Sequence, residues 1–423
     1  MIRIRFKTLV QFVYFFGFLV LWILPYNPKI YYLLQVCLIP SILYYARQKP
    51  SLITSSIVVL GILPDLMMGS TSINYIQHYS LHGISIIVLC ATEMLYLLLC
   101  RKIRFNFVFI TSFLLGCYLL ISKVFARNDI YYNLNFYVAV SLYICLPYFI
   151  LDKEDVLITW EAFITAGTLF TLKLFPRVFL GNTIYESQVL NDRNFMSLKI
   201  TIFLVVTVVY MMKYVNVISK KMISLLCILT AAMLFVILSF ASRTAFVVIV
   251  VFAGSIIIYY FKHNKKLVFV TASLVVILCL IINSTGVMKM LGVRFQEETL
   301  TTGAGRTIVF AGFIQMFLDE GWPLKLFGQG HLVSMARYNF ASTYAHNTYL
   351  QILLDFGLIG FSLFLTHLSV VYHGLNKGQF KMFRCSMFAI MVYIFALHAE
   401  TDWLTVAFFM SCTAVVNCKN LHD

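Results

Sequence analysis

Charged residues are scarce in this chain of 423 residues: Asp, Glu, Lys and Arg make up only 12%, whereas 61% of the residues are hydrophobic. The mean hydropathy is +0.89. A soluble fold cannot hide this much apolar surface, because its exterior needs far more polar side chains. The composition excludes an ordinary soluble enzyme and predicts an integral membrane protein built from helices that satisfy their own backbone hydrogen bonds.

Acidic residues are the scarcer charge type, 17 against 32 Lys and Arg, which leaves a formal net charge of +15. An excess of this size can indicate nucleic-acid binding. Here the basic residues are dispersed between apolar runs and form no basic domain, so we expect no nucleic-acid partner. The excess indicates membrane topology and anionic ligands instead.

Motifs for metals and disulfides are missing as well. The sequence has no CxxC and no HExxH pattern, so we expect no zinc site. We expect no cofactor either. All ten cysteines lie within or beside apolar segments, and none falls between Ser284 and Ala345. A disulfide framework is therefore not expected.

Apolar runs recur along the whole chain at lengths near the roughly 20 helical residues that cross a bilayer. We expect an all-α polytopic membrane protein with about 12–14 transmembrane helices, the lower number applying if the runs near 30–68 and 382–417 include tilted or re-entrant pieces. The runs lie near residues 8–24, 30–46, 51–68, 79–100, 105–122, 130–151, 156–175, 196–212, 222–240, 244–261, 267–283, 348–372, 382–398 and 403–417.

Lys and Arg gather in alternate gaps between these runs, and positive loops stay cytoplasmic. This pattern predicts that both termini are cytoplasmic. It places the loop 181–194, the turn 241–243 and the long polar region 284–345 on the outer face. We expect one integral domain with three parts: an N-terminal bundle (1–283), an extracytoplasmic subregion (284–345) and C-terminal helices (346–423).

The region 284–345 is far richer in glycine than its flanks and somewhat richer in charge. Apolar residues recur at helical spacing from Ile308 to Phe317, which predicts a short amphipathic helix lying along the membrane surface. The segment Gly328-Gln329-Gly330-His331 predicts a turn whose glycines adopt positive φ.

Several charged residues fall inside or at the edge of apolar runs. Arg243 has almost no loop around it, and an arginine there is costly unless it reaches the interface, pairs or binds an anion. It is either an interfacial anchor or a functional residue. Glu93, Glu161 and Asp355 should face the bundle interior, and Asp355 either forms a structural ion pair or orients an arginine.

The order of polar motifs resembles the O-antigen ligase and O-antigen polymerase superfamily. No single motif is specific, but their order and common side carry the resemblance over about the C-terminal half. The motifs are Asn191-Asp192-Arg193-Asn194, Ser242-Arg243-Thr244, Gly305-Arg306, Gly328-Gln329-Gly330, and His346-Asn347-Thr348-Tyr349-Leu350 running into Gly357-Leu358-Ile359-Gly360.

This resemblance implies a multi-pass protein of the bacterial inner membrane whose active site faces the periplasm. Its fold would resemble that of other lipid-linked (GT-C type) glycosyltransferases, and no metal would be needed. Its substrates would be glycans carried by undecaprenyl pyrophosphate. Membrane lipids, a chain-length regulator and a flippase are the further partners we expect.

Polymerases of this superfamily join lipid-linked repeat units, whereas ligases transfer the finished glycan to lipid A core. The loop Asn191–Asn194 is more similar to polymerases, so we favour a polymerase and keep a ligase as the alternative. A lipid-linked oligosaccharide flippase is a remote third possibility, because transporters usually show two related halves and this chain does not.

The residue types then suggest roles. His346 can accept a proton near neutral pH and is the expected general base, while the guanidinium groups of Arg243 and Arg306 stabilise the departing pyrophosphate. The alternatives are a helix cap for His346, a turn-stabilising role for His331, and solvated loop charges for Arg306 and Arg193. The expected substrate-binding residues are Arg193, Asn347, His331 and Tyr349.

Overall fold

The computed structural model describes residues 50–60, 72–100, 107–125, 134–150, 152–179, 193–240, 242–261, 306–331, 345–376, 381–397, 399 and 402–417. Within these ranges the chain forms α-helices and one short 3-10 helix, with no strand, which confirms the all-α prediction. The runs expected near 8–24, 30–46 and 267–283 lie outside the described residues, as does most of the polar region 284–345.

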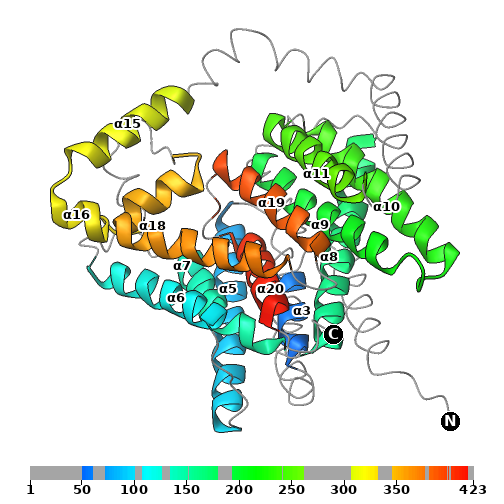
Figure 1. Ribbon diagram of the computed structural model, residues 1–423, viewed down its shortest axis with the longest axis horizontal. Coiled ribbons are helices and arrows are strands. Elements are labelled where there is room, and N and C mark those ends of the chain that lie inside the picture. The colour runs from blue at the N-terminus through cyan, green and yellow to red at the C-terminus, as the bar shows by residue number, and fades with distance from the viewer. Residues whose placement is uncertain are drawn as a thin grey trace.

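Each described bundle helix coincides with a predicted apolar run, and Figure 1 shows their arrangement. The first group is α3 (Ser51–Leu60), α5 (Ser72–Leu99), α6 (Phe107–Phe125), α7 (Leu134–Cys145) with η1 (Leu146–Phe149), α8 (Lys153–Phe179), α9 (Arg193–Tyr214), α10 (Lys220–Ser239) and α11 (Arg243–Phe261). The second is α15 (Arg306–Asp319), α16 (Trp322–Phe327), α18 (Thr348–Gly374), α19 (Lys381–Phe395) and α20 (Trp403–Asn417).

Among the described residues, four helices are long and apolar enough to cross a membrane. They are Lys153–Pro176, Asn194–Tyr214, Lys220–Ser239 and Thr348–Gly374. Shorter apolar helices, including Phe107–Lys123 and Arg243–Tyr259, pack beside them. The chain is therefore a multi-helix membrane protein.

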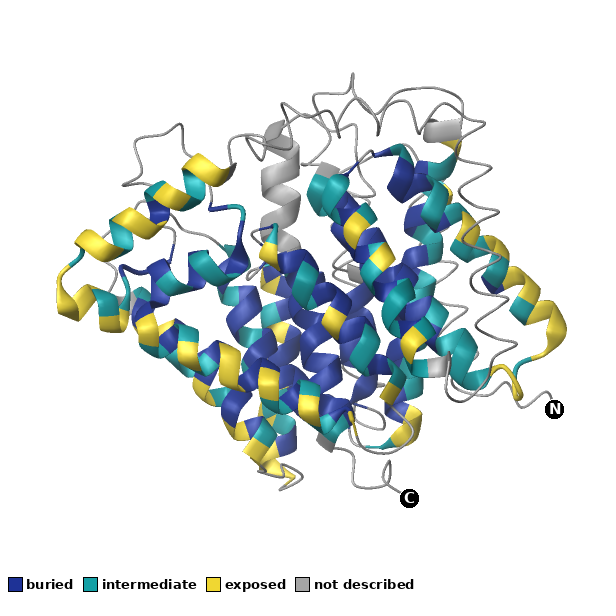
Figure 2. Ribbon diagram, turned by 45° about the horizontal axis from the view of Figure 1, so that its top comes forward, coloured by how far each residue is buried: buried dark blue, intermediate teal, exposed yellow. Residues whose placement is uncertain are grey.

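The core lies around α9 and α20, most of whose residues are buried. Figure 2 shows the buried residues concentrated in the middle of the bundle. An aromatic cluster joins α8, α19 and α20, because the ring of Trp160 lies 4.2 Å from that of Phe383 and 6.1 Å from that of Phe408. The carboxylates Glu93 and Asp355 are buried in the bundle, as predicted. Ionisable side chains in membrane helices face the bundle interior, because exposing them to lipid is costly.

Helices α15 and α16 lie beside the first half of α18, at the left of Figure 1. A helix is present where the sequence predicted one, as α15, but its apolar residues do not share one buried face, because Phe313 is buried while Ile308 and Leu318 are exposed. Phe313 packs against Ala345 and Leu354. Helix α15 therefore rests on the start of α18.

Helix α18 is broken at Gly357, which has a φ of 65° and a ψ of −172°. The turn after α16 crosses this break, and Gly328 and Gly330 have positive φ, as the sequence predicted. The amides of Gln329 and Gly330 donate to the carbonyls of Leu354 (3.1 Å) and Asp355 (2.8 Å). The two backbones therefore touch directly, which only glycine allows at such a crossing.

Candidate active site

Three helix ends meet at one end of the bundle. The Ser242 hydroxyl precedes α11 and donates to Asn194 Oδ1 in the first turn of α9, at 3.1 Å. The Tyr393 hydroxyl, near the end of α19, donates to the Asn194 carbonyl at 3.1 Å. Two motifs that lie 48 residues apart in the sequence are thus held side by side.

The start of α18 joins the same end of the bundle. Thr348 donates to the Leu397 carbonyl through its amide (3.1 Å) and its hydroxyl (2.7 Å). Its hydroxyl also accepts from the Ala399 amide at 2.9 Å. Leu397 lies one helical turn beyond Tyr393, so the end of α19 connects the α18 start to the α9–α11 cluster.

His346 lies directly before the start of α18, two residues before Thr348. It is half-buried and has a φ of 50°, the one positive φ among the described non-glycine residues. Asn347 directly after it is the N-cap of α18, and its Oδ1 accepts from the Leu350 amide at 3.1 Å. Asn347, rather than His346, therefore caps the helix, so capping does not account for the imidazole.

The arginines singled out by the sequence all begin helices: Arg193 opens α9, Arg243 opens α11 and Arg306 opens α15. None of these helices has an acidic residue in its first turn. A cation at a helix N-terminus opposes the helix dipole, whereas an anion there is stabilised. Arg243 is half-buried, and the side chains of Arg193 and Arg306 lie outside the description.

A buried lysine lies further into the bundle. Lys199 Nζ on α9 is 3.8 Å from Asp402 Oδ1, and both side chains are 7% exposed. Asp402 also caps α20, because its Oδ2 accepts from the amide (2.9 Å) and hydroxyl (2.7 Å) of Thr405. This pair fixes the start of α20 against α9.

Two predicted substrate-binding residues are built into the protein interior. His331 is 1% exposed, and its ring stacks on that of Phe136 with the centroids 4.6 Å apart. The Tyr349 hydroxyl donates to the Met391 carbonyl on α19 at 3.0 Å. The position of His331 favours its alternative, structural role over substrate contact, and the bond of Tyr349 to α19 gives that side chain a structural role as well.

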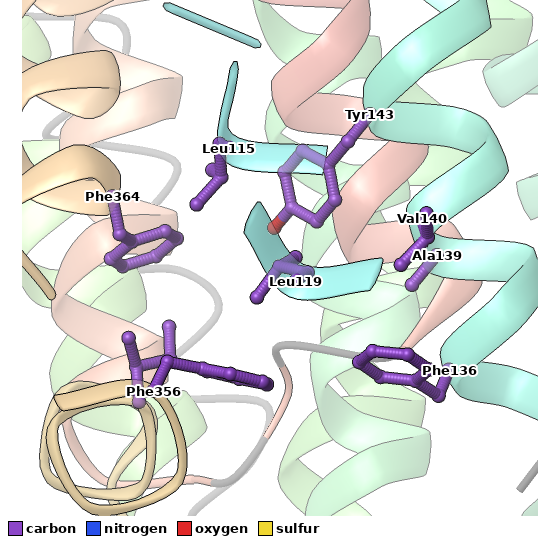
Figure 3. A pocket seen from close by; sticks show the side chains of 9 residues that line it. Leu115, Leu119, Phe136, Ala139, Val140, Tyr143, Phe356 and Phe364 are labelled. Carbon is purple, nitrogen blue, oxygen red and sulfur yellow. The ribbon is translucent and has the colours of Figure 1, made fainter. Parts of the chain in front are cut away.

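A small apolar pocket lies between α6, α7 and α18 (Figure 3). No charged side chain lines it, so it does not suit a phosphate group. Its lining residues are Leu115, Leu119, Phe136, Ala139, Val140, Tyr143, Ile352, Phe356 and Phe364. Within the ranges that the structure describes, no cluster of three or more His, Cys, Asp or Glu side chains could hold a metal ion.

Sequence reasoning missed three residues that organise this end of the bundle: Tyr393, Asp402 and Gln351. Tyr393 and Asp402 look ordinary in the sequence, since tyrosine is common in this chain and Asp402 lies in a short polar gap. Gln351 carried a usable signal. It is a polar residue four positions from both Asn347 and Asp355, so all three follow one helical stripe.

Residues 227–365 match the sequence model of the O-antigen ligase family, about a third of the chain. The matched region contains Arg243, Arg306 and His346, and Arg193 lies before it. No curated protein matches the chain. The family match confirms, over these residues, the resemblance to the O-antigen ligase and polymerase superfamily that the sequence motifs carry.

Proposed function

We propose that the protein is a surface-polysaccharide polymerase of this superfamily. It would join repeat units carried by undecaprenyl pyrophosphate at the periplasmic face of the bacterial inner membrane. The observation that carries the proposal is the grouping of helix N-termini, two of them opened by arginine, beside His346. This end of the bundle suits a lipid-anchored anion.

In the proposed reaction, the acceptor sugar hydroxyl gives its proton to His346 as its oxygen attacks the anomeric carbon of the donor glycan. A glycosidic bond forms, and the bond from that carbon to the pyrophosphate oxygen breaks. The electron pair of that bond leaves with the pyrophosphate. A positioned base typically contributes 10²–10⁴-fold to such a step.

The departing pyrophosphate gains negative charge, and arginine can stabilise it. A guanidinium binds phosphate oxygens through paired hydrogen bonds and remains charged at any physiological pH. Arg243 at the start of α11 is the central candidate, with Arg306 and Arg193 assisting. These cations would supply the electrostatic stabilisation that other enzymes obtain from a divalent metal.

The fixed surroundings of His346 support its role as the base. Thr348 is bound to Leu397 and Ala399, and Asn347 caps the helix, so the backbone after the imidazole is held on one side. A left-handed φ at a non-glycine residue costs about 1–2 kcal/mol. Such strain persists where the surrounding structure imposes it, and it is concentrated at functional sites.

A ligase is the second candidate, because the matching family is described as O-antigen ligase. The two activities differ in the acceptor. Purified protein in lipid nanodiscs should be given undecaprenyl-pyrophosphate-linked repeat units, with and without lipid A core. A ladder of lengthened lipid-linked glycans supports the polymerase, and transfer to the core supports the ligase. Movement of substrate without a new glycosidic bond would support a flippase and contradict both.

His346→Ala and Lys220→Ala form a matched pair for this assay. Lys220 opens α10, which follows the far end of α9, so its loss changes the protein surface away from the proposed site. We expect His346→Ala to lose glycan extension by 10²-fold or more, as for removal of a general base. Wild-type glycan lengths from the His346→Ala protein would remove this residue from the mechanism.

A further inference from the structure

A buried chain of hydrogen bonds connects the interior of α18 to the residue before His346. The Ala345 amide donates to Gln351 Oε1 at 3.2 Å. Gln351 Nε2 donates in turn to Asp355 Oδ2 at 2.9 Å. Asp355 Oδ2 also lies 3.7 Å from His331 Nδ1. Ala345, Gln351 and Asp355 are all 0% exposed, so water does not compete for these contacts.

The order of donors and acceptors in this chain is fixed by chemistry. A backbone N–H can only donate, so the Gln351 side chain must present its oxygen to Ala345. Its NH₂ group then faces Asp355, which supplies the acceptor. Asp355 therefore sets the orientation of the Gln351 amide, and the amide sets the position of the Ala345 peptide.

Packing also holds Ala345 in place. The side chain of Ala345 is buried against Phe313 of α15 and Leu354 of α18. The residues after His346 are bound to the end of α19 through Thr348. The strained backbone at His346 thus lies between two residues that are held in place. Gln351 holds Ala345 on the N-terminal side, and the end of α19 holds Thr348 on the C-terminal side.

We infer that Gln351 and Asp355 are positioning residues that hold His346 in its left-handed conformation through the Ala345 amide. The inference rests on the proposed role of His346 as the general base. Neither residue would touch the substrate, because both are fully buried. Their loss should therefore lower kcat and leave KM nearly unchanged.

Three variants separate positioning from simple stabilisation. Gln351→Met keeps the side-chain volume and removes both hydrogen bonds. Exchanging the pair, with Gln351→Glu and Asp355→Asn together, keeps the chain of hydrogen bonds. The carboxylate at position 351 then accepts from the Ala345 amide and from the side-chain amide at position 355. Tyr118→Phe is the matched control. It removes hydroxyl bonds to the Phe327 (3.1 Å) and Phe356 (2.9 Å) carbonyls at the α18 break, outside the chain to His346.

The first measurement needs no substrate. Hydrogen exchange of the Ala345 amide, followed by mass spectrometry with fragmentation, reports the hydrogen bond to Gln351 directly. We expect exchange to accelerate about 3- to 10-fold in Gln351→Met, the factor that corresponds to the net contribution of one hydrogen bond. The exchanged pair and Tyr118→Phe should keep wild-type protection. Wild-type protection in Gln351→Met would overturn the inference, whatever the enzyme does.

The second measurement is kcat per folded molecule in the nanodisc assay. We expect a fall of at least 10-fold in Gln351→Met, recovery to within about 3-fold in the exchanged pair, and no fall in Tyr118→Phe. A folded exchanged pair with no recovery would contradict the positioning role. If His346→Ala itself stays active, the proposed function fails, and the amide exchange still decides whether Gln351 and Asp355 hold Ala345.

Discussion

Replacing Gly357 with alanine should break the contact between α18 and the turn after α16. An added Cβ would meet the Leu326 carbonyl oxygen and the Gly328 amide nitrogen, both of them backbone atoms. That backbone cannot move away easily, because Gln329 and Gly330 are hydrogen-bonded to α18 at 3.1 Å and 2.8 Å. The φ of 65° at this position is also unfavourable for alanine.

The expected loss combines two costs. A left-handed φ in a residue with a Cβ costs about 1–2 kcal/mol, and forcing an extra methyl group into a packed site costs about 1–3 kcal/mol. Gly357→Ala should therefore lower the free energy of unfolding by about 2–5 kcal/mol. Reversible unfolding in mixed micelles, monitored by circular dichroism, measures this difference.

Gly254→Ala is the control, because Gly254 lies within α11 and an added Cβ there meets no atom within 4 Å. Alanine in a helix interior is favoured over glycine by about 0.5–1 kcal/mol, so this variant should be neutral or more stable. If the free energies of unfolding of the two variants differ by less than about 1 kcal/mol, below the smallest loss expected for Gly357→Ala, the close crossing at Gly357 is refuted.

Three further predictions concern the cap, the helix junction and metals. Asn347→Ala removes the N-cap of α18 and should cost about 1 kcal/mol of unfolding free energy in the same measurement, whereas an unchanged value would deny the cap any role. Tyr393→Phe removes the bond to Asn194 and should cost about 0.5–1.5 kcal/mol, with no change if the hydroxyl is solvated instead. EDTA should leave glycan extension unchanged in the nanodisc assay, and strong inhibition would indicate that the site depends on a divalent metal.

The sequence predicted the helices well, because apolar runs and their polar gaps mark membrane helices directly. It also predicted α15 and the glycine turn. It did not predict the break in α18, since Gly357 lies within a predicted apolar span, as Gly360 does, and a glycine inside a helical span does not by itself mark a break. A break of this kind depends on a second segment that crosses there, here the turn at Gly328.

The candidate site rests on residue types and on their predicted side of the membrane. The alternation of charge in the gaps predicted that Arg243 and His346 lie on the same face. The sequence analysis predicts substrate binding or a turn-stabilising role for His331, and the structure buries it against Phe136 and near Asp355. Partners such as Tyr393 and Asn194 are 199 residues apart, and helical periodicity carries no information about such pairs.

The central claim is that cationic helix ends beside His346 hold a lipid-anchored diphosphate. The most direct test is binding of undecaprenyl pyrophosphate to Arg243→Gln and Lys220→Gln in nanodiscs, which remove one charge each at the start of α11 and α10. Charge-assisted hydrogen bonds contribute about 1.5–3 kcal/mol. We predict that Arg243→Gln weakens binding by about 10- to 100-fold and that Lys220→Gln leaves it unchanged. Equal affinity in the two variants would contradict the account.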